Sequence, residues 1–390
     1  MPARRLIPPR ALLAALVLAC PPAAAQAPPA LTNPNYGFPV PGDHPAAANA
    51  ASAGVALADR WLGTTGFENP ATALPQGLEI SPVFQRVSRQ DLSSQNRDFD
   101  QVVGYPDLAG ARFSLPFGAW GLTLYAWQPA LRLEELSFSA GPLVSPAFVR
   151  LLTSQREIRA GGAVSRAVGA GRLGVSGEWV HREDFYETHE QSGSPLAGDR
   201  RIDLQGDGFG VSAGVAWEKD ADRPWGSWFG AALRYGSELS ATGTYSGVND
   251  FPSGVAPDTT YGFDARRASG WSGGASGRVT IAPSTRFLLG VSFRSAADWP
   301  GLGLTTGTGL AWSAGFDWKD PELPWGARFG VGQESLPDAV ESRAGLLAVG
   351  FTWVSGDLVI DAGILHRNLA RGDLARSADD RGVLSVRVAF

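Results

Sequence analysis

Apolar and polar side chains alternate along most of this chain with a period of two residues. In the segment 285–295, Phe287, Leu289, Val291 and Phe293 share one parity, while glycine, serine and arginine occupy most of the other positions. The stretches GLAWSAGFDW and GFGVSAGVAWE repeat the pattern. Because successive side chains of a strand point to opposite faces, the pattern predicts β-strands with one apolar and one polar face.

Fourteen such strands are predicted. They span residues 76–89, 108–117, 120–138, 154–168, 172–187, 201–219, 225–245, 261–282, 285–295, 304–319, 325–334, 342–355, 357–367 and 382–390. Tight turns such as VGAG and APST alternate with long polar segments such as YETHEQSGSPLAGDRR, and each tight turn follows an even-numbered strand. An even strand count with short turns at one end and long loops at the other is typical of bacterial outer-membrane barrels.

Tryptophans at strand ends indicate whether the apolar faces of the strands contact a protein core or lipid. In a soluble sandwich that parity would face a core, whereas in a membrane barrel it faces lipid. Aromatic residues collect where a barrel wall meets the membrane surface. Those at strand ends are Trp120, Trp217, Trp225, Trp318, Trp325 and Trp353. The sequence therefore predicts an all-β protein, a fourteen-stranded antiparallel transmembrane β-barrel.

The charge and composition of the chain argue against nucleic acid as a partner and against membrane helices in the mature chain. The 390 residues include 33 basic and 38 acidic residues, for a formal charge of −5, and no basic block that would favour nucleic acid. No apolar run after the first 25 residues reaches the length of about 20 residues that a membrane helix needs.

The first 25 residues have the three regions of a secretory signal. Arg4, Arg5 and Arg10 flank the start of the apolar run ALLAALVLAC, and the small-residue stretch PPAAAQ follows. We expect cleavage after Ala25. The alternative is a lipoprotein signal acylated at Cys20. If Cys20 leaves with the signal, the mature chain has no cysteine, and hence no disulfide and no thiolate metal site.

The segment 26–75 lacks alternation and is rich in alanine, glycine and proline, a composition that by itself is typical of a linker. However, ANAASAGVALAD followed by ENPA resembles the plug segment of the outer-membrane long-chain fatty acid and hydrocarbon transporter family. The matching positions are Ala53, Gly54, Ala56, Ala58, Asp59, Asn69, Pro70 and Ala71. Arg60 and Trp61 depart from the pattern, because the family usually has a paired acid there.

The resemblance implies a signal peptide at 1–25, a plug at 26–75 that fills the lumen, and a barrel at 76–390. It also implies a monomer in the outer membrane of a Gram-negative-type bacterium, which takes up long-chain fatty acids or hydrocarbons passively and without a cofactor. Its partners would be outer-membrane lipid and the hydrophobic ligand. The terminal Phe390 resembles the signal read by the barrel-assembly machinery.

A change of parity marks the third strand. Apolar positions are even before the dipeptide Gln128-Pro129 and odd after it, at Leu131 and Leu133. One extra residue in a strand produces such a flip, and proline cannot donate to the ladder, so we expect a bulge or break there. In the family a kink in this strand opens the wall toward lipid, which makes Gln128 and Pro129 a candidate lateral gate. The alternative is an ordinary bulge.

The stretch SPAFVRLLTSQR predicts a helix in an external loop, with Ser145 as its N-cap and Pro146 in its first turn. Its apolar stripe consists of Phe148, Val149, Leu151 and Leu152. Such a stripe either packs on neighbouring loops or captures a hydrophobic ligand.

Several charged or large side chains fall on the inward parity. The candidate ligand contacts are Glu178, Arg182, Trp228, Arg234, Arg294 and Arg328, and Val180, Glu238, Leu288, Asp361 and Arg387 share that parity. Paired charges of this kind normally hold the wall and the plug together. They also allow an arginine to bind a ligand carboxylate.

Catalysis is not expected. His44, His181, His189 and His366 show no metal-ligand spacing, and no HExxH, GxSxG or phosphate-loop motif occurs. His181, Asp184 and His189 lie near the end of a strand, as catalytic groups of barrel hydrolases do, but a solvated loop is the simpler interpretation. Two other functions remain open: a scaffold or cargo shuttle of a secretion system, and a general porin.

Overall fold

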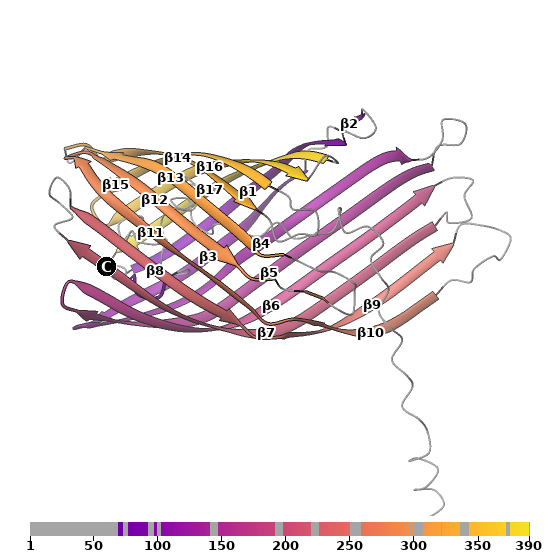
Figure 1. Cartoon of the computed structure of the whole chain (residues 1–390), viewed down its shortest axis with the longest axis horizontal. Coiled ribbons are helices and arrows are strands. Elements are labelled where there is room, and N and C mark those ends of the chain that lie inside the picture. Colours follow the sequence, from indigo (N-terminus) through magenta and orange to yellow (C-terminus); the bar gives the residue numbers. More distant parts are fainter. Residues whose placement is uncertain are drawn as a thin grey trace, which may run out of the picture.

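The chain folds into a closed barrel of antiparallel strands (Figure 1). The computed structural model describes residues 69–72, 77–92, 97–99, 103–140, 147–191, 198–219, 226–249, 259–296, 298–299, 307–320, 322–335, 343–371 and 375–389. The strands are β1 (Gly77–Leu92), β2 (Arg97–Phe99), β3 (Val103–Phe117), β4 (Trp120–Ala140), β5 (Ala147–Val168), β6 (Gly171–Gln191), β7 (Gly198–Lys219), β8 (Ser227–Gly236), β9 (Leu239–Asn249), β10 (Thr259–Arg267), β11 (Gly270–Ala282), β12 (Thr285–Arg294), β13 (Gly309–Lys319), β14 (Trp325–Ser335), β15 (Arg343–Ser355), β16 (Leu358–Arg371) and β17 (Ala375–Ala389).

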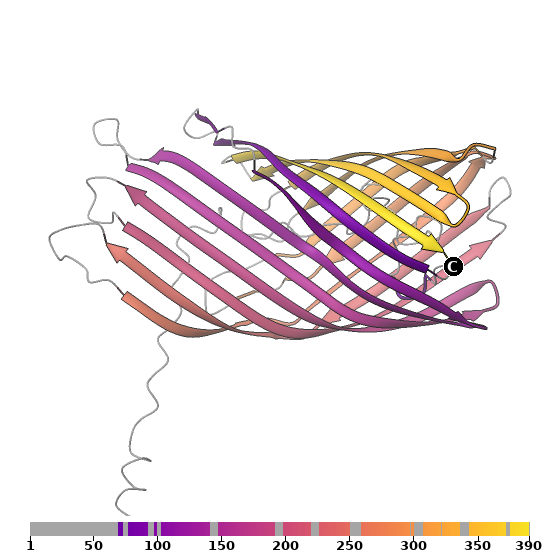
Figure 2. The same cartoon turned by 180° about the vertical axis from the view of Figure 1, so that it is seen from behind.

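The seventeen strands occupy fourteen places in the wall. Both β2 and β3 pair with β1, both β8 and β9 pair with β7, and β10 and β11 pair with β9 and β8 in turn. The first strand, β1, also pairs with the last, β17, from Gly77 opposite Ala389 onward, which closes the wall (Figure 2). The predicted fourteen-stranded antiparallel barrel is confirmed.

Short turns gather at one end of the barrel. β3 connects to β4, β5 to β6, and β15 to β16 through two residues each, the first of which is Gly118, Gly169 or Gly356. These glycines have φ of 57 to 59°, a left-handed conformation that costs little only without a Cβ. The turns at this end are therefore encoded locally.

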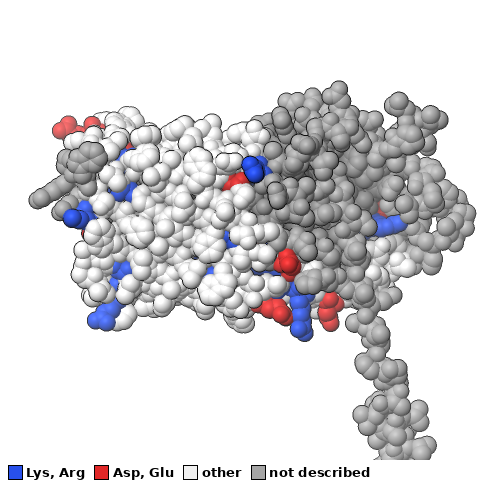
Figure 3. All heavy atoms as spheres, viewed as in Figure 1, with Lys and Arg blue, Asp and Glu red and all other residues white. Residues whose placement is uncertain are grey.

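The outer surface carries an apolar band. On β7 the outward residues Phe209, Val211, Ala213, Val215 and Trp217 are all exposed. From the first to the last of them the strand rises about 26 Å, or about 20 Å along the axis of a barrel with the usual tilt. On the face drawn in Figure 3, the described outer surface is mostly uncharged. Such a band matches the hydrocarbon of a bilayer, whereas in water its exposure would be unfavourable.

The band ends at one level on neighbouring strands. Beyond Phe209 the outward residues of β7 are Asp207, Gln205 and Asp203, and beyond Trp179 the outward residue of β6 is His181. Strands β4 to β7 have 21 or 22 residues, whereas β12 to β14 have 10 or 11. A tilted strand of about 10 residues just crosses a membrane, so the long strands β4 to β7 extend well beyond the bilayer. Figure 1 shows them reaching further toward the long loops than β12 to β14.

The strands β8, β12 and β14 each end at, or directly before, a serine whose hydroxyl accepts a backbone amide of a neighbouring strand. These serines are Ser237, Ser295 and Ser335. The amide of Ser237 donates to the carbonyl of Phe209 at 2.7 Å, and the Ser237 hydroxyl accepts the amide of Phe209 at 2.9 Å. Ser295 repeats this arrangement with Trp271, at 2.7 and 2.8 Å. Because the hydroxyl replaces the carbonyl that has turned away, the ladder ends without an unpaired amide at this point.

Ser237 also marks a shift of register. Gly210 lies opposite Gly236, and Asp207 lies opposite Ser240, so β8 and β9 contain one residue more than β7 over this distance. The shift reverses the parity, and Glu238, expected to point inward, is exposed with Ser240. That expectation was wrong because a polar bulge residue cannot be distinguished from an outward one by pattern alone.

Three expectations concern parts of the chain outside the described residues: the signal peptide at 1–25, the plug at 26–68 and 73–75, and the assembly signal at Phe390. Within the residues that are described, no helix is long and apolar enough to cross a bilayer.

Candidate functional site

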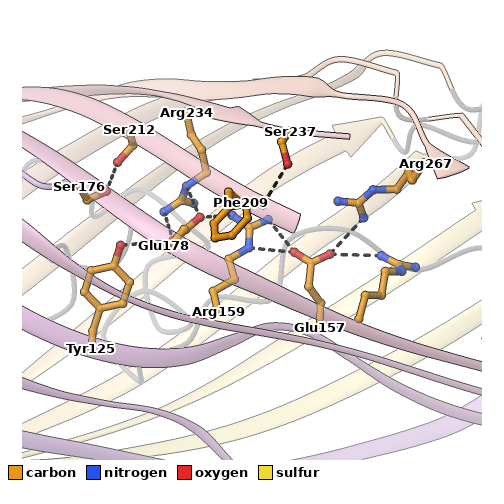
Figure 4. A network of polar contacts seen from close by, with 11 residues as sticks. Tyr125, Glu157, Arg159, Ser176, Glu178, Phe209, Ser212, Arg234, Ser237 and Arg267 are labelled. Atoms are coloured by element: carbon orange, nitrogen blue, oxygen red, sulfur yellow. Dashed lines mark hydrogen bonds and ion pairs between the residues drawn. The ribbon is translucent and has the colours of Figure 1, made fainter. Parts of the chain in front are cut away.

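Glu178 lies at the centre of a polar network on the inner face of the wall (Figure 4). In register, it has Gly161 of β5 on one side and Gly210 of β7 on the other. A Cβ at Gly210 would lie 2.7 Å from Oε1 of Glu178. The missing side chain at Gly210 therefore leaves space that the Glu178 carboxylate occupies.

Three side chains converge on the Glu178 carboxylate. Oε1 lies 3.0 Å from Nη1 of Arg159 and 3.0 Å from Nε of Arg234, and Oε2 accepts the Tyr125 hydroxyl at 3.2 Å. The Glu178 side chain is only 1% exposed. A carboxylate removed from water in this way is stable only when cations compensate for the lost hydration.

Glu157 forms a second centre beside the first. Its Oε1 lies 2.6 Å from Arg159, and its Oε2 lies 3.3 Å from Arg182 and 3.2 Å from Arg267. Arg182 also donates to both oxygens of Asp184, at 2.7 and 2.9 Å. Because Glu157 lies directly opposite Arg182 in the ladder of β5 and β6, the pair of Glu157 and Arg182 follows from the register.

Trp127 connects this network to β4. The guanidinium groups of Arg159 and Arg234 lie 5.4 and 5.1 Å from its ring centre, within range of a cation–π interaction. Trp127 is also the last residue of β4 that pairs with β3, opposite Gly110. The charged network thus reaches the point where two strands of the wall separate.

The register of β4 against β5 shifts where the sequence predicts a bulge. Trp127 lies opposite Arg159 and Ala130 lies opposite Glu157, so β4 has one extra residue, within the dipeptide Gln128-Pro129. Beyond Trp127, the described residues of β4 pair with β5 only. The wall therefore has a gap in its ladder between β3 and β4 on the long-loop side.

The inner face becomes apolar where the outer face becomes polar. On β7 the inward residues Ile202 and Leu204 are buried, while Asp203 and Gln205 between and beside them point outward. The buried cluster comprises Val180, Ile202, Leu204, Leu239, Ala241, Phe263, Ala265 and Trp299, with Tyr186, Tyr245 and Tyr261 packed against it. Beyond the membrane band, β7, β9 and β10 thus combine a water-facing outside with an apolar, aromatic inner face.

The turn Asn69 to Thr72 lies against the inner wall. Nδ2 of Asn69 donates to the carbonyl of Val215 in β7 at 3.0 Å, while Oδ1 accepts the amide of Ala71 at 3.0 Å. The hydroxyl of Thr72 donates to the Asn69 carbonyl at 2.7 Å. Asn69, Pro70 and Ala71, the proposed plug motif, are all buried, and Asn69 and Ala71 have no exposed surface.

The candidate ligand contacts fall into separate groups. Glu178, Arg182 and Arg234 belong to the network described above. Trp228 of β8 is outside that network, and its ring centre lies 4.4 Å from the guanidinium of Arg278 in β11. Arg328 pairs with Asp361 at 3.1 Å and Asp317 at 3.4 Å. Arg294 is exposed at the end of β12. These residues do not form a single site.

The predicted external helix is wrong, because Phe148, Val149, Leu151 and Leu152 lie in β5. Phe148 pairs with Ser139 of β4 and with Gln191 of β6. A short apolar run is compatible with either a helix or a strand, and here pairing on both sides selects the strand. Capture of a hydrophobic ligand by these residues stays a prediction.

The sequence-based list missed Tyr125, Trp127, Glu157, Arg159 and Arg267. A signal for some of them exists: Glu157 and Arg159 are two residues apart, as are Arg182 and Asp184, so each pair shares one face of its strand. Of the apolar cluster, only Val180 was expected on the inward parity, and the other members were missed for another reason. On β7 the residues of the cluster lie on the parity that is polar within the membrane.

The side chains considered for metal binding and catalysis are separated in the described part of the wall. The described residues contain no group of three or more His, Cys, Asp or Glu side chains that could hold a metal ion. His181 points outward and lies 3.0 Å from Asp207 and 3.2 Å from Glu183, whereas Asp184 is buried on the inner face. His181 and Asp184, two of the three residues considered for catalysis, therefore lie on opposite sides of the wall.

Solved structures resemble this barrel closely although the sequences differ. A Pseudomonas aeruginosa FadL homologue matches 90% of the chain over 100% of its own length, with a TM-score of 0.64 and 14% identity. The toluene transporter TodX of P. putida matches 91% of the chain over 99% of its length (TM-score 0.60, 13% identity), and the Ralstonia pickettii toluene transporter TbuX matches 91% over 99% (TM-score 0.58, 14% identity). No protein-family model and no curated protein matches the sequence. The chain has the fold of these transporters, a closed fourteen-stranded barrel.

Proposed function

We propose that this protein is an outer-membrane channel for the passive uptake of hydrophobic compounds, either long-chain fatty acids or hydrocarbons. The inverted lining carries the proposal: where β7, β9 and β10 project beyond the membrane, their inner face is apolar and aromatic. A general porin needs a polar lumen along its whole length. A lining of leucine, isoleucine and aromatic side chains favours a ligand that leaves water by burial, which contributes about 25 cal/mol per Å² of apolar surface.

The path starts at this apolar lining, on the long-loop side. It continues past the charged network around Glu178, where an arginine is available for a ligand carboxylate. The gap beyond Trp127 and the bulge at Gln128 and Pro129 lie next to that network, so the gap provides a lateral exit toward lipid. The solved transporters of toluene and monoaromatic hydrocarbons with this fold support the assignment of the ligand class.

The remaining features of the proposal follow the sequence. Residues 1–25 act as a signal peptide, 26–75 form the plug, and 76–390 form the barrel, which Phe390 helps to deliver to the assembly machinery. The protein acts as a monomer in the outer membrane, without a cofactor.

A pair of neighbouring substitutions tests the function. Leu204→Asn places an amide in the apolar lining, whereas Gln205→Asn changes the outward side chain beside it. Uptake of a labelled long-chain fatty acid and of toluene is measured in cells that lack the native gene and express each variant. We expect uptake to fall with Leu204→Asn and to match the wild type with Gln205→Asn.

Two results would contradict the proposal. One is a deletion strain whose uptake of several fatty acids and aromatic hydrocarbons equals that of the parent. The other is free passage of small hydrophilic solutes through the purified wild-type protein in planar bilayers, which would identify a porin.

A further inference from the structure

The turn Asn69 to Thr72 fits into a hollow of the wall made by two glycines. Gly174 of β6 and Gly214 of β7 lie directly opposite each other in the ladder. Both are buried, on the inward parity of their strands. Two side chains are therefore missing side by side at the place where the turn approaches.

Contact distances show that the turn occupies the space of the missing side chains. A Cβ at Gly174 would collide with the backbone of Pro70 and with the amide nitrogen of Ala71. A Cβ at Gly214 would collide with Oδ1 of Asn69 and lie 3.1 Å from Cδ of Pro70. The first collision is with backbone atoms, so rotation of a side chain cannot relieve it.

Other glycines of the same wall do not have this role. A Cβ at Gly177, three residues further along β6, would meet no atom within 4 Å. At Gly210 it would meet Glu178, and at Gly206 it would meet Leu239 and Ala241, all of them wall residues. Among the described glycines with contacts of this kind, the pair Gly174 and Gly214 is the one that faces the turn.

Asn69 adds a directional contact to this steric fit. Its Nδ2 reaches the Val215 carbonyl of the wall, and its Oδ1 holds the amide of Ala71 within the turn. The side chain thus fixes the shape of the turn and its position on the wall at once. An asparagine supplies a donor and an acceptor on one planar group, which aspartate and alanine do not.

We propose that Gly174 and Gly214 form a seat for the turn, and that this seat positions the N-terminal segment inside the lumen. Asn69 holds the turn in this seat through the two hydrogen bonds of its side chain. The inference rests on the proposed function in one respect: the seated turn has to be released, or to shift, when a ligand passes. The two glycines and Asn69 are positioning residues, because they act through the turn and not on the ligand.

Alanine substitutions test the seat, with Gly177→Ala as the matched control on β6. Hydrogen exchange of the Ala71 and Thr72 amides is followed by mass spectrometry in the full-length mature protein in detergent. With Gly174→Ala or Gly214→Ala we expect exchange to be about tenfold faster or more, the effect of losing one hydrogen bond. With Gly177→Ala it should equal that of the wild type. Folding of each barrel is checked by its heat-dependent mobility in gel electrophoresis.

Asn69→Ala provides a second variant, because it leaves the wall unchanged. It should accelerate exchange at Ala71 and Thr72 as the glycine substitutions do. Small-ion conductance in planar bilayers should rise in the same three variants and not in Gly177→Ala, since the segment is no longer held in the lumen.

The outcomes separate the seat from the transport function. Exchange at Ala71 and Thr72 that is equal in Gly214→Ala, Asn69→Ala and Gly177→Ala would overturn the seat. Faster exchange in the seat variants supports it, even if the wild type transports no hydrophobic compound. In that case only the proposed function and its link to release of the turn fail.

Discussion

His181 of β6 and Asp207 of β7 lie opposite each other on the outer face, with Nδ1 of the histidine 3.0 Å from Oδ1 of the aspartate. The next pair toward the short turns is Trp179 and Phe209, which are exposed and apolar. The transition from an aromatic pair to a polar pair takes place within one step of the ladder. It sets the level at which the hydrocarbon of the bilayer ends on this side of the barrel.

The position of this boundary can be tested with arginine. Ala213 lies in the middle of the outward apolar run of β7, and Gln205 lies on the same face beyond Asp207. We expect Ala213→Arg to lower the free energy of unfolding by about 2 to 4 kcal/mol, because the charge enters the middle of the membrane. Gln205→Arg should change it by less than about 1 kcal/mol. Urea titration in phospholipid vesicles measures both, and equal effects would mean that the boundary is misplaced.

The buried network around Glu178 predicts a second difference. Glu178→Gln removes the charge that two arginines share, and we expect a loss of about 3 kcal/mol or more in the free energy of unfolding, as for other broken buried ion pairs. Glu183→Gln affects a solvent-exposed contact with His181, for which less than about 1 kcal/mol is expected. If the two variants unfold at the same urea concentration, the network does not stabilise the wall.

Most of the wall could be predicted from the sequence, because alternation and turn chemistry are local signals. The glycine turn at Gly169, for example, separates two strands whose patterns are clear on their own. The pattern does not show which part of a strand faces lipid and which part faces water. On β7 the apolar residues change from Leu204 to Phe209, from one parity to the other, without any break in the pairing with β6. Only the position of the membrane explains that change.

At Ser237 the opposite happens, because a true register shift leaves no clear trace in the composition. The sequence offers the same alternation on both sides, and the extra residue is recognisable only when β7 is placed beside it. The seat of the turn is hidden for a similar reason. Gly174 and Gly214 are 40 positions apart and become neighbours only through the pairing of β6 and β7.

The serine at this shift gives a third prediction. The Ser237 hydroxyl accepts the amide of Phe209 and donates to the carbonyl of Glu238, both at 2.9 Å. Ser237→Ala removes both bonds and leaves the Phe209 amide without this acceptor, so a loss of about 1 to 2 kcal/mol in stability is expected. Exchange of the Phe209 amide should accelerate accordingly. Ser240→Ala, on the exposed outer side of β9, serves as the control and should leave that amide unchanged.

The gap beyond Trp127 gives the last prediction, which concerns the exit. Deleting Pro129 removes the extra residue of β4, so that the parity of its two halves agrees and β4 can continue its ladder with β3. We expect the proposed lateral exit to close and the uptake of hydrophobic compounds to fall toward that of a deletion strain. Binding of the same compounds to the purified protein, measured by calorimetry, should remain, because the apolar lining at Leu204 and Phe263 is unchanged.

Replacing Pro129 with alanine keeps the extra residue and should preserve uptake. If the deletion variant folds, binds and transports like the wild type, the ligand leaves the barrel by another route, and the bulge at Gln128 and Pro129 is a structural feature of β4 alone.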